Sequence, residues 1–171
     1  MRLFVALELP AAVVSHADAV VAPVRPRHPQ LRWVPAARWH LTLAFSGQVP
    51  DEGVEALRDS VTRAVRSRVP LELRLAGAGS FRDRVVWLGV QGDLRALGDL
   101  ARDLGSDRLP FHPHLTIARL RRGQDGHAAA GELTGYSGPT WVAGSVHLVR
   151  SRLGATPSYE VLTTWTLGEH P

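Results

Sequence analysis

The sequence predicts an α+β fold with substantial antiparallel pairing, and three observations support this class. Segments of strand and helix character follow one another in the order strand, helix, strand, strand, helix, then strand, strand, helix and three strands. The strict strand–helix alternation that indicates a parallel sheet does not occur. No Pro-, Gly- or Ser-rich linker divides the chain, so we expect residues 1–171 to form a single domain.

The first half of the chain begins with an alternating segment, residues 2–9, that is typical of a strand. Pro10 then occupies a first-turn position, where proline is tolerated, and valines at helical spacing continue a helix to about residue 24. Asp51 is a suitable N-cap for a second helix that ends near residue 68. Between the two helices the sequence predicts two strands and a turn, at residues 31–34, 39–45 and 46–50.

The second half contains five predicted strands and one clear helix. Leucines at helical spacing predict the helix over residues 93–104. The segment Gly77-Ala78-Gly79 predicts a turn region, and residues 121–139, rich in Gly and Ala, predict a loop with a short helix. The strands are expected at residues 71–75, 85–90, 114–119, 142–150 and 159–167.

Composition limits the class of protein. Apolar residues make up 44% of the chain and charged residues 21%, as in folded globular proteins. The chain has no cysteine, which excludes disulfides, thiolate metal sites and a cysteine nucleophile, and suits a reducing cytoplasm. No stretch reaches the roughly 18 to 20 apolar residues of a membrane span, and the N-terminus is too soon acidic for a secretory signal. We therefore expect a cytoplasmic protein, with a monomer as the default state.

The charge of the chain permits an anionic substrate. Its 20 basic residues exceed its 16 acidic residues by four, and every basic residue is an arginine. The planar guanidinium group suits phosphate and stacks on nucleobases, although a genomic bias toward arginine explains the composition more simply. A modest positive excess is thus compatible with a phosphate-bearing substrate without requiring one.

One short motif occurs twice, as His-Leu-Thr-Leu at residues 40–43 and His-Leu-Thr-Ile at residues 114–117. In a strand, residues two apart point to the same face. Each motif therefore presents its histidine and threonine on one face and its two aliphatic residues on the other. Because the arrangement is repeated, we expect two such strands to place a pair of imidazoles across a groove.

This residue set suits the opening of a cyclic phosphodiester. The reaction needs a base to activate water and an acid to protonate the departing ribose oxygen, and histidine titrates near neutral pH. Threonine hydroxyls can donate to the non-bridging oxygens as charge builds at phosphorus. The candidate catalytic residues are His40 and His114, the candidate phosphate-binding residues are Thr42 and Thr116, and the scheme requires no metal or cofactor.

With these motifs the chain resembles the 2H phosphoesterase superfamily, in particular its bacterial and archaeal RNA 2′,3′-cyclic phosphodiesterase branch, historically called 2′-5′ RNA ligases. The resemblance covers nearly the whole chain in order, and only residues 121–139 are hard to place. The matching segments are residues 2–7, 32–34, 39–47, 77–81, 86–90, 111–119, 151–153 and 159–162.

The resemblance implies two pseudo-symmetric lobes of antiparallel sheet with outer helices around a central groove. The two motifs would line this groove. It also implies that His114 activates water and that His40 protonates the ribose 3′ oxygen, which leaves a 2′-phosphate. The symmetry of the motifs leaves this order of acid and base open.

Three neighbours of the motifs are further candidates. Phe45 and Arg119 each follow a motif histidine by five residues, and the resemblance implies that they bind the terminal nucleotide. In a regular strand this odd offset points to the opposite face, so core packing of Phe45 is an equal alternative unless a bulge intervenes. His112 forms a His-x-His pair with His114, a pattern that can bind metal. No carboxylate cluster accompanies it, so we expect His112 to be solvated or to lie at the groove rim, and we expect no metal site.

The expected partners are RNA 3′ ends or nucleotides that bear a 2′,3′-cyclic phosphate, with no membrane partner. Three alternatives stay open. The same groove can run in reverse as a 2′-5′ RNA ligase, with a ribose 5′-hydroxyl in place of water. A non-catalytic module that binds RNA ends is the second alternative, and a metal-dependent phosphodiesterase is the third. The sequence does not distinguish transfer RNA halves, oligonucleotides and small cyclic-phosphate metabolites as substrates.

Overall fold

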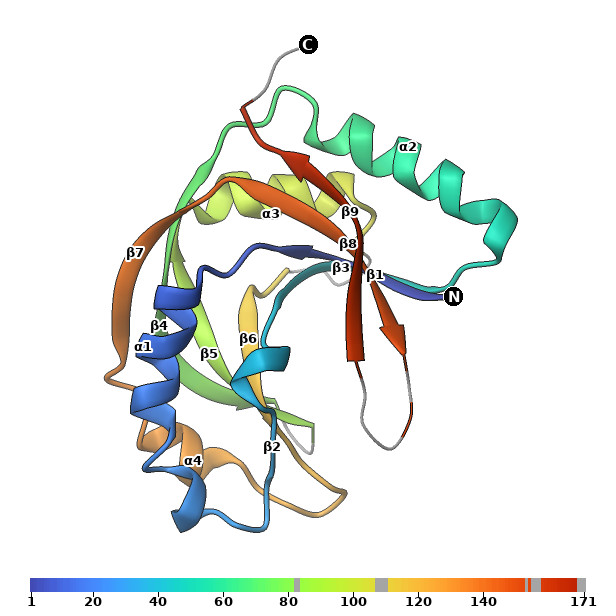
Figure 1. Cartoon of the computed structure of the whole chain (residues 1–171). Coiled ribbons are helices and arrows are strands. Elements are labelled where there is room, and N and C mark those ends of the chain that lie inside the picture. The colour runs from blue at the N-terminus through green and yellow to red at the C-terminus, as the bar shows by residue number, and fades with distance from the viewer. Residues whose placement is uncertain (82–83, 107–110, 153, 155–157, 169–171) are drawn as a thin grey trace.

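A computed structural model describes residues 1–81, 84–106, 111–152, 154 and 158–168. In these residues nine strands form one curled antiparallel sheet (Figure 1). Its order is β7-β4-β5-β6-β3-β1-β8-β9, and the short strand β2 pairs with β6. With helices packed on this sheet, the predicted α+β class is confirmed.

The strands are β1 (Arg2–Leu7), β2 (Arg32–Trp33), β3 (Leu41–Gln48), β4 (Leu71–Phe81), β5 (Val85–Gly92), β6 (His114–Arg119), β7 (Ser137–Ala143), β8 (Ser145–Arg152) and β9 (Ser158–Thr166). The α-helices are α1 (Ala11–Val21), α2 (Val54–Val65), α3 (Leu94–Asp103) and α4 (His127–Gly131). Short 3-10 helices cover Arg25–Arg27, Ala36–Arg38 and Asp51–Gly53. None of the described helices is long and apolar enough to cross a membrane.

The sheet consists of two four-stranded halves that meet at its centre. We call β3, β1, β8 and β9 the first half-sheet, and β6, β5, β4 and β7 the second half-sheet. The halves join where β3 meets β6, through the single register pair Leu41 and Leu115. Helices α1 and α4 contact strands of the second half-sheet, whereas α2 and α3 contact β9 and β3 of the first. Because α1 follows β1 but packs on β7, the two halves are intertwined along the chain (Figure 1).

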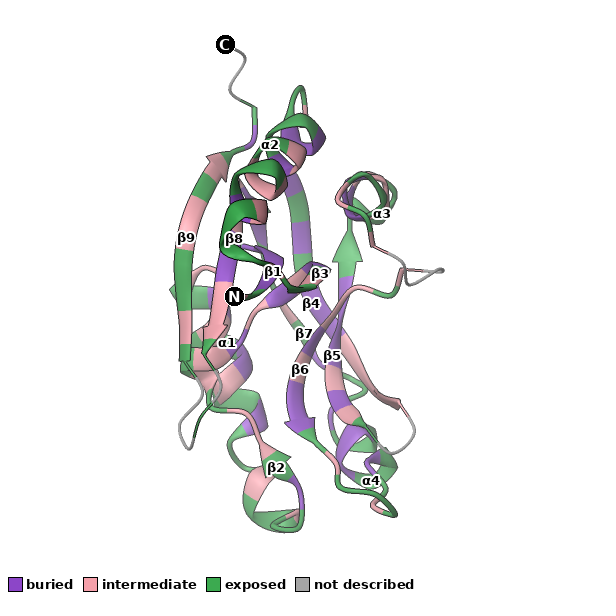
Figure 2. Cartoon of the chain, turned by 90° about the vertical axis from the view of Figure 1, so that its right-hand side faces the viewer, coloured by how far each residue is buried: buried purple, intermediate pink, exposed green. Residues whose placement is uncertain are grey.

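The main core lies on one face of the sheet. Side chains of the central strands fill it, and Figure 2 shows buried segments on β1 and β6, whereas β9 is exposed or half-buried. On β1 the alternation is direct: Leu3, Val5 and Leu7 belong to the main core, whereas Phe4 and Ala6 belong to a separate small cluster. Since alternate residues of a strand face opposite ways, this small cluster marks the other face, which we call the site face.

Three predicted elements differ from the structure. The Gly77-Ala78-Gly79 segment is part of the long strand β4 rather than a turn. Its glycines are explained by packing, because a Cβ at Gly79 would come within 2.3 Å of the Trp87 ring, and Gly77 has a φ of +70° where the strand register shifts. The strand predicted at residues 142–150 is two strands, β7 and β8, and the turn predicted at residues 46–50 lies largely within β3.

We expect Leu115→Ala to lower the free energy of unfolding by about 2 to 5 kcal/mol, because Leu115 is fully buried at the junction of the two half-sheets and its loss leaves a cavity. Urea denaturation measures this change. The matched control is Leu94→Ala on α3, where the side chain is 42% exposed and the expected change is about 0.5 kcal/mol or less. Equal effects of the two substitutions would contradict this account of the junction.

Candidate active site

The two His-Leu-Thr motifs lie side by side at the centre of the sheet, on β3 and β6. Leu41 pairs with Leu115, and the two strands run antiparallel. His40 and Thr116 therefore lie on one side of this pair, and Thr42 and His114 lie on the other. The leucines belong to the main core, so strand alternation directs both histidines and both threonines to the site face.

The neighbouring strands confirm this assignment of faces. Thr42 is opposite Ala6 of β1, which belongs to the small cluster on the site face. On the second half-sheet, Thr116 is opposite Trp87 and His114 is opposite Gly89 of β5. The predicted juxtaposition of the two motifs is therefore present in the fold.

Both motif histidines are held in the same way. The Nδ1 atom of His40 lies 2.9 Å from the backbone oxygen of Arg38, and Nδ1 of His114 lies 2.7 Å from the backbone oxygen of His112. A carbonyl oxygen only accepts hydrogen bonds, so each Nδ1 carries the hydrogen and donates it. In the neutral rings Nε2 is consequently the basic nitrogen, the ring atom that can accept a proton.

A matching bulge in each motif strand changes the direction of the residues that follow. In β3 the register against β1 shifts between Thr42 and Ala44, and in β6 the register against β5 shifts between Thr116 and Ala118. Each extra residue turns the rest of its strand to the other face.

Phe45 and Arg119 follow these bulges. The Phe45 ring lies 6.2 Å from that of Phe4 on the site face, and its side chain is 56% exposed, so it does not pack in the core. Arg119 is exposed, and its charge acts on His40. The structure thus brings both candidates to the face that carries the motif histidines.

Aromatic side chains surround His40 on the first half-sheet. Its ring centroid lies 4.7 Å from that of Phe4 and 4.9 Å from that of Tyr159, and Phe4 and Tyr159 contact each other edge to face at 5.5 Å. Together with exposed Phe45 and Val161, these rings make an apolar wall beside His40.

A second aromatic cluster surrounds His114. Its ring lies edge-on to Phe81 at 5.2 Å and 6.4 Å from Trp87. His112 is exposed and packs against Trp87 at 4.7 Å, which agrees with a histidine at the rim of the groove. Within the described residues no three His, Asp or Glu side chains converge as metal ligands.

The environment of His40 lowers its pKa. Burial is the largest cause, because the charged ring loses hydration, and the positive charges of Arg119 and His114 act in the same direction. The hydrogen bond to the Arg38 carbonyl opposes them by stabilising the protonated ring. Arg119 and His114 both belong to β6, so their electrostatic effect on His40 is a further sign that the two motifs form one site.

We expect the imidazole pKa of His40 in the free protein to lie below the ordinary value of about 6.5, and Arg119→Gln to raise it. Removing a positive charge stabilises the protonated ring, so deprotonation moves to higher pH. Nitrogen-15 NMR of the histidine rings across a pH titration measures both values. A pKa that is unchanged or lower in Arg119→Gln would show that Arg119 does not face His40.

Sequence reasoning did not single out the aromatic residues around the two histidines, although several lie in segments that carry the resemblance. Phe4 sits in a strand that is apolar on both faces, so its pattern did not distinguish core from site. Tyr159 and Trp87 come from β9 and β5, which lie on opposite sides of the motif strands. The available signal was the unbroken run of apolar residues at 3–7, which leaves no polar face on this strand and so indicates a second apolar surface.

A sequence profile of the 2′-5′ RNA ligase superfamily matches residues 9–155, and the chain belongs to that superfamily. An RNA 2′,3′-cyclic phosphodiesterase of Geobacillus stearothermophilus is 32% identical over an alignment of 154 positions. The alignment covers 79% of this chain and 47% of that protein, so the chain spans about half of the relative's length. One of Thermus thermophilus is 33% identical over an alignment of 193 positions, which covers 99% of this chain and 92% of that protein.

Solved structures agree with this family. The structure of LigT from E. coli complexed with 3′-AMP matches with a TM-score of 0.77 at 32% identity, covering 98% of each chain. The structure of TT0787 from Thermus thermophilus matches with a TM-score of 0.75 at 29% identity, covering 99% of this chain and 100% of the other. The family predicted from the motifs is confirmed, and the curled antiparallel sheet is its fold.

Proposed function

We propose that this protein hydrolyses 2′,3′-cyclic phosphates on RNA 3′ ends or nucleotides to 2′-phosphomonoesters. The observation that carries the proposal is the central strand pair, which directs two histidines and two threonines to one face of the sheet. Relatives named RNA 2′,3′-cyclic phosphodiesterase support this reaction. The proposal includes a single domain of two intertwined lobes that acts as a monomer in the cytoplasm, without a cofactor.

In the proposed mechanism the two histidines act from Nε2. His114 accepts a proton from water as the water oxygen bonds to phosphorus, and the bond from phosphorus to O3′ breaks. His40 donates its proton to O3′, so the phosphate stays on O2′. The hydroxyls of Thr42 and Thr116 donate to the non-bridging oxygens, whose negative charge grows in the transition state.

The lowered pKa of His40 adds a condition to this mechanism. As an acid His40 must be protonated, yet burial and neighbouring positive charges disfavour its charged form in the free protein. A bound phosphate carries negative charge and offsets the repulsion from Arg119 and His114. We therefore propose that His40 takes up its proton when substrate binds.

The terminal nucleotide fits the wall beside His40. Phe45 is an exposed ring on the site face, and nucleobases stack on such rings. Arg119 lies close enough to affect His40, and its guanidinium suits either the phosphate or a base. We propose Phe45 and Arg119 as substrate-binding residues on this basis.

Incubation of the protein with 2′,3′-cyclic AMP tests the proposal. Phosphorus NMR distinguishes the possible products, and we expect 2′-AMP to accumulate. Failure to form a 2′-phosphomonoester counts against hydrolysis by this site. An added oligonucleotide with a free 5′-hydroxyl tests ligation, which would give a 2′-5′ linkage in place of the monoester. EDTA tests the metal-dependent alternative. That alternative predicts loss of activity in EDTA, whereas the paired-histidine mechanism predicts unchanged activity.

A further inference from the structure

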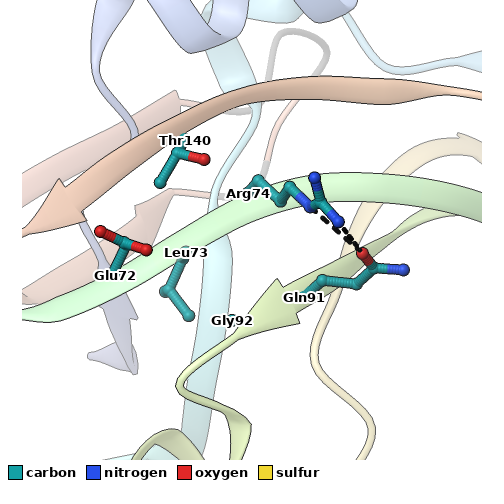
Figure 3. A pocket seen from close by; sticks show the side chains of 6 residues that line it. All are labelled: Glu72, Leu73, Arg74, Gln91, Gly92 and Thr140. Atoms are coloured by element: carbon teal, nitrogen blue, oxygen red, sulfur yellow. Dashed lines mark hydrogen bonds between the residues drawn. The ribbon is translucent and has the colours of Figure 1, made fainter.

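The second half-sheet carries a polar recess of about 290 Å³ that the proposed mechanism does not use. Strands β4, β5 and β7 line it with Glu72, Leu73, Arg74, Gln91, Gly92 and Thr140 (Figure 3).

This recess is a continuation of the site face. On β5, Gly89 is opposite His114, and Gln91 lies two residues further along, on the same face. Gln91 is opposite Arg74 of β4, and Arg74 is opposite Thr140 of β7. Two residues of a strand span about 7 Å and adjacent strands lie about 5 Å apart, so the recess begins within one nucleotide's reach of His114.

The recess presents hydrogen-bond donors. Nε and Nη2 of Arg74 donate to Oε1 of Gln91 at 3.1 Å and 2.8 Å, which fixes the guanidinium against the amide. The Gln91 amide nitrogen, Nη1 of Arg74 and the Thr140 hydroxyl are further donors of this set. In Figure 3 the carboxylate of Glu72 lies at the opposite end of the recess from the guanidinium, and in the described chain no carboxylate forms an ion pair with Arg74.

We propose that this recess binds a phosphodiester group of the RNA chain on the 5′ side of the terminal nucleotide. An oriented guanidinium with neighbouring amide and hydroxyl donors is suited to a phosphate anion. The exposed Phe45 ring beside His40 takes the terminal base, and the chain continues past His114 to the polar recess on the second half-sheet. This inference rests on the proposed function and specifies its substrate as an oligonucleotide end.

The test compares 2′,3′-cyclic AMP with a trinucleotide that ends in a 2′,3′-cyclic phosphate. We expect the parent protein to have a higher kcat/KM for the trinucleotide. Arg74→Gln should lower kcat/KM for the trinucleotide about tenfold, because it loses a charged hydrogen bond, and leave the value for cyclic AMP unchanged. The salt dependence with the trinucleotide should weaken by about one unit of slope.

Two further variants sharpen this test. Gln91→Glu places a carboxylate against Arg74 and should reproduce the loss that is selective for the trinucleotide. Arg63→Gln removes an exposed arginine from α2 and should leave kcat/KM unchanged for both substrates. If Arg74→Gln leaves kcat/KM for the trinucleotide unchanged, or lowers kcat/KM equally for both substrates, the proposed phosphodiester site in the recess is wrong, and the proposed function still stands. Absence of turnover of either substrate by the parent overturns both.

Discussion

We expect His40→Ala and His114→Ala each to lower kcat for 2′,3′-cyclic AMP by about 10³- to 10⁴-fold, because each removes a group that moves a proton in the transition state. The double variant should lose little more than either single variant. The two groups act as a unit, so the second loss has nothing left to remove. Steady-state rates with purified variants measure these effects.

A matched control is His127→Ala, which removes an exposed histidine on α4, on an element apart from the motif strands, and should leave kcat unchanged. Binding of a trinucleotide that ends in a 2′-phosphate, measured by fluorescence anisotropy, should persist in both motif variants. If both variants turn over substrate like the parent, the paired-histidine mechanism is wrong. Thermal unfolding of the same samples shows whether a variant that does not bind is still folded.

The second large effect is expected at the motif threonines. Thr42→Val and Thr116→Val should each lower kcat by about 10²- to 10³-fold, because each removes a donor to the oxygens that gain charge in the transition state. Valine keeps the shape of the threonine side chain, so the packing of the strands against Ala6 and Trp87 is retained. The measurement is kcat and KM with the same cyclic nucleotide.

The control at these positions is serine. Thr42→Ser and Thr116→Ser keep the hydroxyl and lose only a methyl group, so they should stay within about tenfold of the parent. A valine variant as active as its serine counterpart would show that the hydroxyl does not act on the phosphate. A rise in KM with unchanged kcat would assign the threonine to ground-state binding instead.

Much of the candidate site followed from strand periodicity. The alternation of His114, Leu115, Thr116 and Ile117 predicted a strand with one apolar and one polar face, and β6 has the predicted bounds. The duplication of this pattern predicted that the two motifs act together. Periodicity is a local property, so one short segment is enough to detect it.

Long-range features were outside the reach of that reasoning. The placement of β3 next to β6 depends on the whole strand order, and the matched bulges that turn Phe45 and Arg119 to the site face depend on the register against β1 and β5. The glycines of β4 were mistaken for a turn because their cause, the Trp87 ring packed over Gly79, lies on another strand.

The most direct test of the account is a titration of the protein with 2′-AMP, the proposed product, followed by nitrogen-15 NMR of the histidine rings. Nε2 of His40 and Nε2 of His114 should shift together with one dissociation constant, and the pKa of His40 should rise in the complex. A shift of only one of these rings, or two separate dissociation constants, would contradict a single phosphate held between the two motifs.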